Sequence, residues 1–174
     1  EPSLPVLSVA EGVEGYLKAG VPPAKIVLGL AFYGYSFAGV DPQNRGLYQR
    51  FTGKSGAHSW VELQERYIGK NGFTRYLDEL AKAPYLWNPD TRTVISYDDP
   101  ESHRHKVEYV KQKGLGGVMY WEHFHDPGES LLDDRRVLPA VVVQRLEVLV
   151  DDLVVVQEFL GRQEIAPADL VAVE

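Results

Sequence analysis

Residues 25–33 read KIVLGLAFY, and they carry the main signal for the architecture of this chain. A continuous apolar run of this length is typical of a strand that is buried on both faces, as in a parallel sheet. Residues 8–19 precede it and predict a helix, because Ser8 and Glu11 form a capping box and Gly20 is a natural stop. The chain therefore opens with a helix that leads into a buried strand.

A second helix and strand follow later in the chain. The helix is expected at 99–113, with Asp99 as its N-cap, Pro100 at its first position and Gly114 at its end. Residues 116–121 are apolar and predict another short buried strand. Helices that alternate with buried strands indicate an α/β fold built on a parallel sheet.

Residues 38–98 have a different amino-acid composition, rich in Gly, Tyr, Asn and charged residues. We expect them to form a small α+β insertion domain between two portions of the parallel sheet, 1–37 and 99–161. Within it, Trp60–Tyr67 and Thr74–Lys82 are predicted as short helices. Leu86–Asn88 and Thr93–Tyr97 are predicted as short strands.

The C-terminal stretch carries apolar residues at heptad spacing, which predicts a helix that Pro139 could open. It is interpreted as an outer helix of the α/β layer or as a helix that pairs with another chain. Its many valines leave two strands as an alternative. Residues 162–174 are expected to be a loose tail. The heptad positions are Val142, Leu146, Leu149, Leu153, Val156 and Leu160.

Composition excludes several classes of protein. The 174 residues are 44% hydrophobic and 25% charged, which is typical of a folded globular chain rather than a disordered one. No apolar run is long enough for a membrane span, and the net charge of −7 argues against nucleic-acid binding. The absence of cysteine excludes disulfides and thiolate sites. Because residue 1 is Glu and no signal segment follows, we expect a processed or excised chain.

Three segments in register resemble the C-terminal portion of a glycoside hydrolase family 18 chitinase. They are Gly29–Phe37 (GLAFYGYSF), Ile95–Ser102 (ISYDDPES) and Gly114–Glu122 (GLGGVMYWE). That family is a (β/α)8 TIM barrel, so the resemblance implies a partial barrel. Residues 25–33 would be its seventh strand and 117–121 its eighth, and the insertion would be the chitinase insertion domain.

The resemblance also implies a chemistry. Family members hydrolyse β-1,4-linked N-acetylglucosamine polymers with retention, using the substrate's own acetamido oxygen as nucleophile. Their general acid lies in an Asp-x-x-Asp-x-Asp-x-Glu motif, which is absent here; the nearest run, 151–158, has the wrong spacing. The family's usual Arg after Tyr-Gly is Tyr35 in this chain, and its usual Pro after Gly-Leu is Ala31. The chain alone is therefore expected not to hydrolyse chitin.

The resemblance makes the chain a supplier of sugar-binding residues rather than of catalytic ones. Trp121 matches the family's floor under the reactive sugar, and an indole face suits the apolar face of a pyranose. Core packing is the alternative role for each aromatic candidate, and a turn or capping role is the alternative for the acidic one. The expected substrate-binding residues are Trp121, Tyr33, Met119, Tyr35, Trp87 and Asp98.

No cofactor and no metal site are predicted. His103 and His105 are two apart on a predicted helix, where such residues do not share a face. His123 and His125 fall in a predicted loop beyond a strand and are interpreted as exposed or capping residues. Glu122, beside Trp121, is expected to point away from it by strand alternation.

Partners follow from these expectations. The expected ligand is chitin or another glycan that contains N-acetylglucosamine, with no nucleic acid and no membrane. The alternatives are a non-catalytic glycan-binding module and an interaction fragment that uses the C-terminal helix. An incomplete barrel leaves open strand edges, so a homo-oligomer is also expected. The compartment is left open, with secretion or the cell surface expected for the parent protein.

Overall fold

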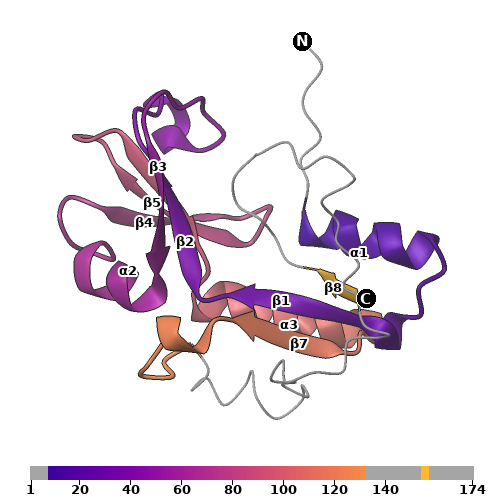
Figure 1. Ribbon diagram of the computed structural model, residues 1–174. Coiled ribbons are helices and arrows are strands. Elements are labelled where there is room, and N and C mark those ends of the chain that lie inside the picture. The colour runs from indigo at the N-terminus through magenta and orange to yellow at the C-terminus, as the bar shows by residue number, and fades with distance from the viewer. Residues whose placement is uncertain (1–7, 132–153, 157–174) are drawn as a thin grey trace.

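The computed structural model describes residues 8–131 and 154–156, and its elements form two sheets (Figure 1). None of the helices among these residues is long and apolar enough to cross a membrane. Three short 3₁₀ turns complete the described elements: η1 (Pro23–Lys25), η2 (Gln43–Gly46) and η3 (His123–His125). The helices and strands are α1 (Val9–Lys18), β1 (Ile26–Ala31), β2 (Tyr33–Phe37), β3 (Ser55–Ser59), α2 (Trp60–Arg66), β4 (Thr74–Asp78), β5 (Ala83–Asn88), β6 (Thr93–Tyr97), α3 (Pro100–Lys113), β7 (Gly117–Trp121) and β8 (Val154–Val156).

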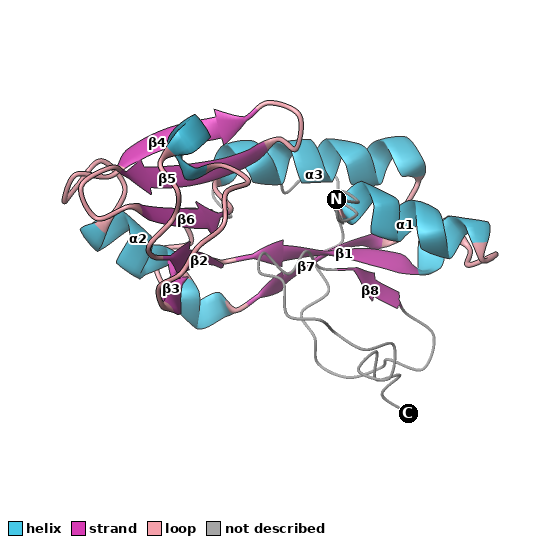
Figure 2. Cartoon of the chain, turned by 90° about the horizontal axis from the view of Figure 1, so that it is seen from above, coloured by secondary structure: helices cyan, strands magenta, loops and turns pink. Residues whose placement is uncertain are grey.

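The first sheet is parallel and has the order β7-β1-β8. Every residue of β1 is buried, as its continuous apolar sequence predicts. The helices expected at 8–19 and 99–113 are confirmed. Ser8 caps α1 with a complete capping box, and Asp99 caps α3, which ends at Gly114 with a φ of 64°. Figure 2 shows α3 running along the strands, and its Val107 and Val110 share one core with β1.

The second sheet is antiparallel, with the order β3-β2-β6-β5-β4, and α2 packs on it. The expected helix near Trp60 is α2, and the expected strand at 93–97 is β6. The helix predicted at Thr74–Lys82 is wrong, because 74–78 is strand β4 and a turn follows. The Asp78 carboxylate accepts hydrogen bonds from the N–H groups of Leu80 and Ala81, which favours a turn over a helix.

The C-terminal helix prediction is also wrong where the structure describes it. Residues 154–156 form β8, which pairs with Ile26–Leu28 of β1. Three consecutive valines are β-branched, and such residues favour extended backbone. The expected strand alternative matches these three residues. The other heptad positions and the expected tail at 162–174 lie outside the described residues.

The chain passes from one sheet to the other at a single residue, Phe32. The expected strand at 25–33 is divided there, because β1 ends at Ala31 and β2 begins at Tyr33. The Phe32 N–H donates to the Trp121 carbonyl at 2.8 Å, and its own carbonyl accepts from the Trp60 N–H at 2.9 Å. Strand β2 therefore joins the antiparallel sheet before residue 38, where the insertion was expected to begin.

Candidate functional site

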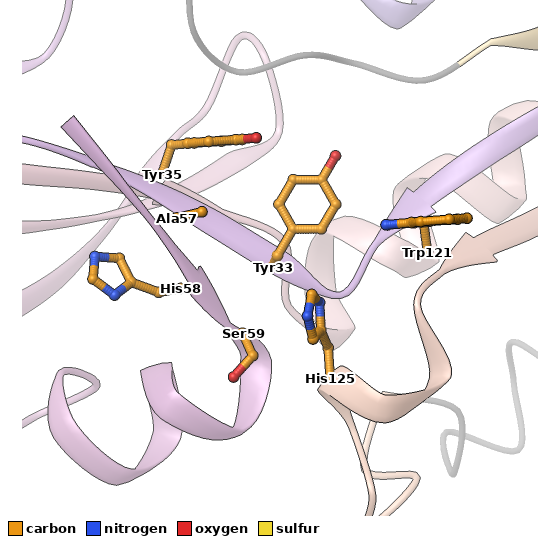
Figure 3. A pocket seen from close by; sticks show the side chains of 7 residues that line it. All are labelled: Tyr33, Tyr35, Ala57, His58, Ser59, Trp121 and His125. Atoms are coloured by element: carbon orange, nitrogen blue, oxygen red, sulfur yellow. The ribbon is translucent and has the colours of Figure 1, made fainter.

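A pocket of about 440 Å³ lies where the two sheets meet (Figure 3). It sits at the C-terminal end of β7, next to the first residues of β2 and the last residues of β3. In a parallel α/β sheet this is the end of the strands at which ligands bind. The lining residues are Tyr33, Tyr35, Ala57, His58, Ser59, Trp121 and His125.

One wall comes from a single face of β2 and β3. Tyr33 lies opposite Ser59 and Tyr35 lies opposite Ala57, so the two tyrosines stand beside small neighbours. The tyrosine rings are 5.7 Å apart and nearly perpendicular. Gly34 between them must be small, because a Cβ there would lie 2.6 Å from the Ser96 carbonyl oxygen. The strand can therefore pack closely on one side while it presents phenols on the other.

Trp121 forms the opposite wall, at the last position of β7. Its side chain is 53% exposed, which is unusual for the largest apolar side chain at the end of a buried strand. Figure 3 shows its indole on the same side of the ribbon as the rings of Tyr33 and Tyr35. The peptide bond that follows, between Trp121 and Glu122, is cis.

The third wall is His125, on the turn η3 that follows β7. Its ring stands edge-on to Tyr33 with the centroids 6.3 Å apart, and its Nε2 is 3.2 Å from Glu122 Oε1. His58 contributes to the lining from β3, but Figure 3 shows its ring directed away from Tyr33. The His58 Nε2 lies 2.9 Å from the Ser36 hydroxyl on the other side of the strand.

The pocket is aromatic and carries no Asp, Glu, Lys or Arg among its lining residues. Burial, with smaller contributions from Tyr35 and Asp98, raises the pKa of Tyr33 to about 12. Its phenol therefore stays protonated at neutral pH, where it can both donate and accept a hydrogen bond. Flat apolar rings with a few hydroxyl groups suit a neutral ligand that has one apolar face and a polar rim.

The structure brings together only some of the residues expected to bind substrate. Tyr33, Tyr35 and Trp121 line the pocket. Met119 is 5% exposed and lies within β7, and Trp87 is 5% exposed in a second apolar cluster. Neither residue lines the pocket, so a direct contact with ligand stays a prediction for both.

Asp98 is buried behind the pocket rather than in its lining. Its carboxylate is 2.6 Å from the Lys106 ammonium and 3.7 Å from His103 Nε2, and it accepts a 2.8 Å hydrogen bond from the Ser102 hydroxyl. It also accepts from the Ala31 N–H at 3.4 Å, next to the sheet crossing. Burial alone would raise the pKa of this carboxyl, but Lys106 and His103 outweigh it and hold the pKa well below its usual range.

Sequence reasoning did not place four of the lining residues in the site: Ala57, His58, Ser59 and His125. Strand β3 reads SGAHS, which lacks the alternation of apolar and polar residues that reveals a strand and its faces. His125 was weighed as a metal ligand and interpreted as an exposed or capping residue. Within residues 8–131 no group of three or more His, Asp or Glu side chains could hold a metal ion.

Comparisons with family models, with curated proteins and with solved structures all match the same family. Residues 2–126 match the family model described as glycosyl hydrolases family 18. The chain is 44% identical over 137 residues to chitinase A1 of Niallia circulans, covering 75% of this chain and 20% of that protein. The chain thus spans about a fifth of the length of that relative.

Solved structures agree with the sequence comparison. A family 18 N-acetylglucosaminidase from Paenibacillus barengoltzii matches with a TM-score of 0.70 and 48% identity, over 76% of this chain and 39% of that one. A class V chitinase mutant of Nicotiana tobaccum, in complex with NAG4, matches with a TM-score of 0.61 and 27% identity, over 74% and 37% of the two chains. These neighbours imply a TIM-barrel-like α/β fold.

Proposed function

The chain belongs to glycoside hydrolase family 18, and from this premise we propose that it supplies part of the sugar-binding groove of a chitinase-like glycosidase. The proposed ligand is a β-1,4-linked N-acetylglucosamine chain. The proposed division of labour is that this chain holds the sugar while the catalytic acid comes from elsewhere, because no Asp-x-x-Asp-x-Asp-x-Glu motif occurs in its sequence.

The observation that carries the proposal is the half-exposed indole of Trp121 beside two phenols. A pyranose presents an apolar C–H face and a rim of hydroxyl and acetamido groups. The face can lie on the Trp121 indole, while the rim meets the Tyr33 and Tyr35 hydroxyl groups. A lining without formal charge favours this neutral ligand over a phosphorylated or strongly ionic one.

We further propose that the antiparallel sheet is the insertion domain of the family and that the parallel strands belong to its barrel. The support is positional. Strand β2 continues directly from β1 through Phe32, and α3 returns the chain to β7 beside β1. An insertion between two neighbouring barrel strands would stand as a wall beside the C-terminal ends of those strands, where barrel sites lie.

The proposal is tested by measuring whether the chain binds a chitooligosaccharide, independently of any hydrolysis. Calorimetric titration of the 174-residue chain with chitotetraose should show binding that falls at least tenfold in Trp121→Ala. Phe124→Ala is the matched control, because Phe124 is 83% exposed on the next turn and does not line the pocket. Unchanged affinity in the Trp121 variant, or equal losses in both variants, would contradict the proposal.

A second candidate is a glycan-binding module that never takes part in cleavage, and the same lining favours it because it offers no carboxylate to act as a general acid. Both candidates predict binding by this chain and no release of reducing ends from chitooligosaccharides. They separate when the chain is supplied with the part of a family 18 barrel that bears the acidic motif. Hydrolysis by the mixture supports the first candidate, and continued inactivity supports the second.

A further inference from the structure

His125 contacts both sides of the junction between the two sheets. One edge of its ring faces Tyr33 of β2, with the centroids 6.3 Å apart and the planes at 79°. On the other side its Nε2 lies 3.2 Å from the Glu122 carboxylate, in the residue directly after Trp121. Figure 3 shows the ring below and between Tyr33 and Trp121.

The turn that carries His125 is itself fixed in place. The His125 N–H donates to the Glu122 carbonyl at 3.0 Å. The Asp126 carboxylate accepts from the Ser130 N–H and hydroxyl and from the Leu131 N–H, at distances from 2.7 to 3.0 Å. Leu131 is fully buried in the main core. The backbone therefore presents His125 to the pocket from a held position rather than from a free loop.

We propose that His125 is a positioning residue that sets the spacing between Tyr33 and Trp121. These two side chains belong to different sheets, and the backbone next to Tyr33 crosses from one sheet to the other at Phe32. A side chain that packs on Tyr33 and binds Glu122 restrains that junction across the pocket. Without it, the phenol and the indole lose one restraint that links their two neighbourhoods and can shift relative to each other.

The identity of the ligand in this inference rests on the proposed sugar-binding function. A pyranose that lies on Trp121 and meets the Tyr33 hydroxyl needs both groups at one separation, and small errors in such spacing weaken binding strongly. His125 thus acts through its two neighbours on the affinity for an N-acetylglucosamine chain. It does not need to touch the sugar.

The binding test compares two histidines of one turn. His125→Ala should weaken chitotetraose binding about tenfold, which corresponds to about 1.4 kcal/mol. His123→Ala should leave binding unchanged, because His123 is exposed and contacts only the rings of Tyr120 and Phe124 among the ring contacts of the described residues. His125→Gln should retain part of the affinity, since it keeps a polar side chain with N–H groups beside the Glu122 carboxylate. Equal affinities for the two alanine variants would overturn the proposal.

A double-mutant cycle separates positioning from general destabilisation. In a Glu122→Gln background, His125→Ala should cost clearly less affinity than in the original chain. The contact between His125 and residue 122 is already weakened there, so less is lost with the imidazole. The urea midpoint of His125→Ala should stay close to that of His123→Ala. Fully additive losses in affinity, or a matching loss of stability, would show a purely structural role.

A measurement on the free protein, without sugar, tests whether His125 affects the position of the Trp121 indole. The indole N–H resonance of Trp121, assigned by its loss in Trp121→Phe, should move in His125→Ala and stay in place in His123→Ala. An unmoved resonance overturns the positioning role. If this resonance moves while the original chain binds no chitotetraose, the sugar-binding function fails and the positioning geometry stands.

Discussion

The ion pair between Asp98 and Lys106 gives the sharpest stability prediction. The two side chains are 4% and 15% exposed, and their charged atoms are 2.6 Å apart. Asp98→Asn keeps the shape of the side chain and an acceptor for the Ser102 hydroxyl, but it removes the negative charge that faces the Lys106 ammonium. We expect this variant to fold with a markedly lower free energy of unfolding.

The magnitude follows from the burial of the pair. Removing one partner of a buried pair costs about 3–5 kcal/mol, and the isosteric amide favours the lower end, about 3 kcal/mol. A domain of this kind has a total stability of about 5–15 kcal/mol, so the loss is large but leaves a folded chain. The double variant Asp98→Asn with Lys106→Met should lose about 2 kcal/mol less than the two single losses combined, because both members of the pair are then removed together.

The same carboxyl makes part of the stability depend on pH. Its pKa is depressed in the folded chain, so its contribution is present above the unfolded value of about 3.9 and is lost as pH falls through the folded value. Asp98→Asn lacks this titration. The stability difference between the original chain and the variant should therefore be about 1 kcal/mol smaller at pH 3 than at pH 7.

Urea unfolding followed by far-ultraviolet circular dichroism measures both quantities. Lys106→Arg is a suitable control, because it keeps the positive charge and changes only its shape. A loss below 1 kcal/mol for Asp98→Asn at pH 7 would refute the reasoning, as would a difference that does not shrink in acid. Either result would mean that the pair contributes no more than a surface ion pair does.

Two further predictions concern the packing of a glycine and a hydrogen bond of a buried indole. Gly46→Ala should lower the free energy of unfolding by about 1–3 kcal/mol, because its Cβ would lie 2.5 Å from Val94 Cγ2 and 2.7 Å from the Trp87 ring, at a φ of 74°; a thermal midpoint equal to that of the original chain would contradict this. Ser130→Ala should cost about 1–2 kcal/mol, because the buried Trp60 indole N–H donates to that hydroxyl at 2.7 Å. Ser130→Thr, which keeps the acceptor, should recover most of this loss in the same urea titration.

Apart from β8, the sequence predicted the parallel portion well because its signals are local and strong. A continuous apolar strand at 26–31, a capping box at Ser8 and a left-handed glycine at 114 each have one dominant structural meaning. The antiparallel portion was predicted less well. Residues 74–82 contain helix formers, and only the pairing of β4 with β5 fixes the strand, which is a tertiary effect that no local pattern carries.

The site was predictable in part for a related reason. Trp121, Tyr33 and Tyr35 lie on motifs that carry the family resemblance. His125 reaches the pocket through a turn whose shape depends on Asp126 and Ser130, and nothing in the local sequence reveals that shape. Asp98 lies in a motif as well, but its surroundings come from α3, so the sequence could not distinguish a buried ion pair from a sugar contact.

The crossing at Phe32 has a consequence for which sequence changes this fold can tolerate. Side chains alternate along β2, so a single inserted or deleted residue between Ala31 and Tyr33 would move both tyrosines to the opposite face of the sheet. The aromatic wall would be lost although every residue of it remained. The segment between β2 and β3, residues 38–54, has its own constraints, because Val40 pairs with Phe51 and Gly46 packs closely against the Trp87 ring. Length variation among natural relatives should therefore be rare at Phe32.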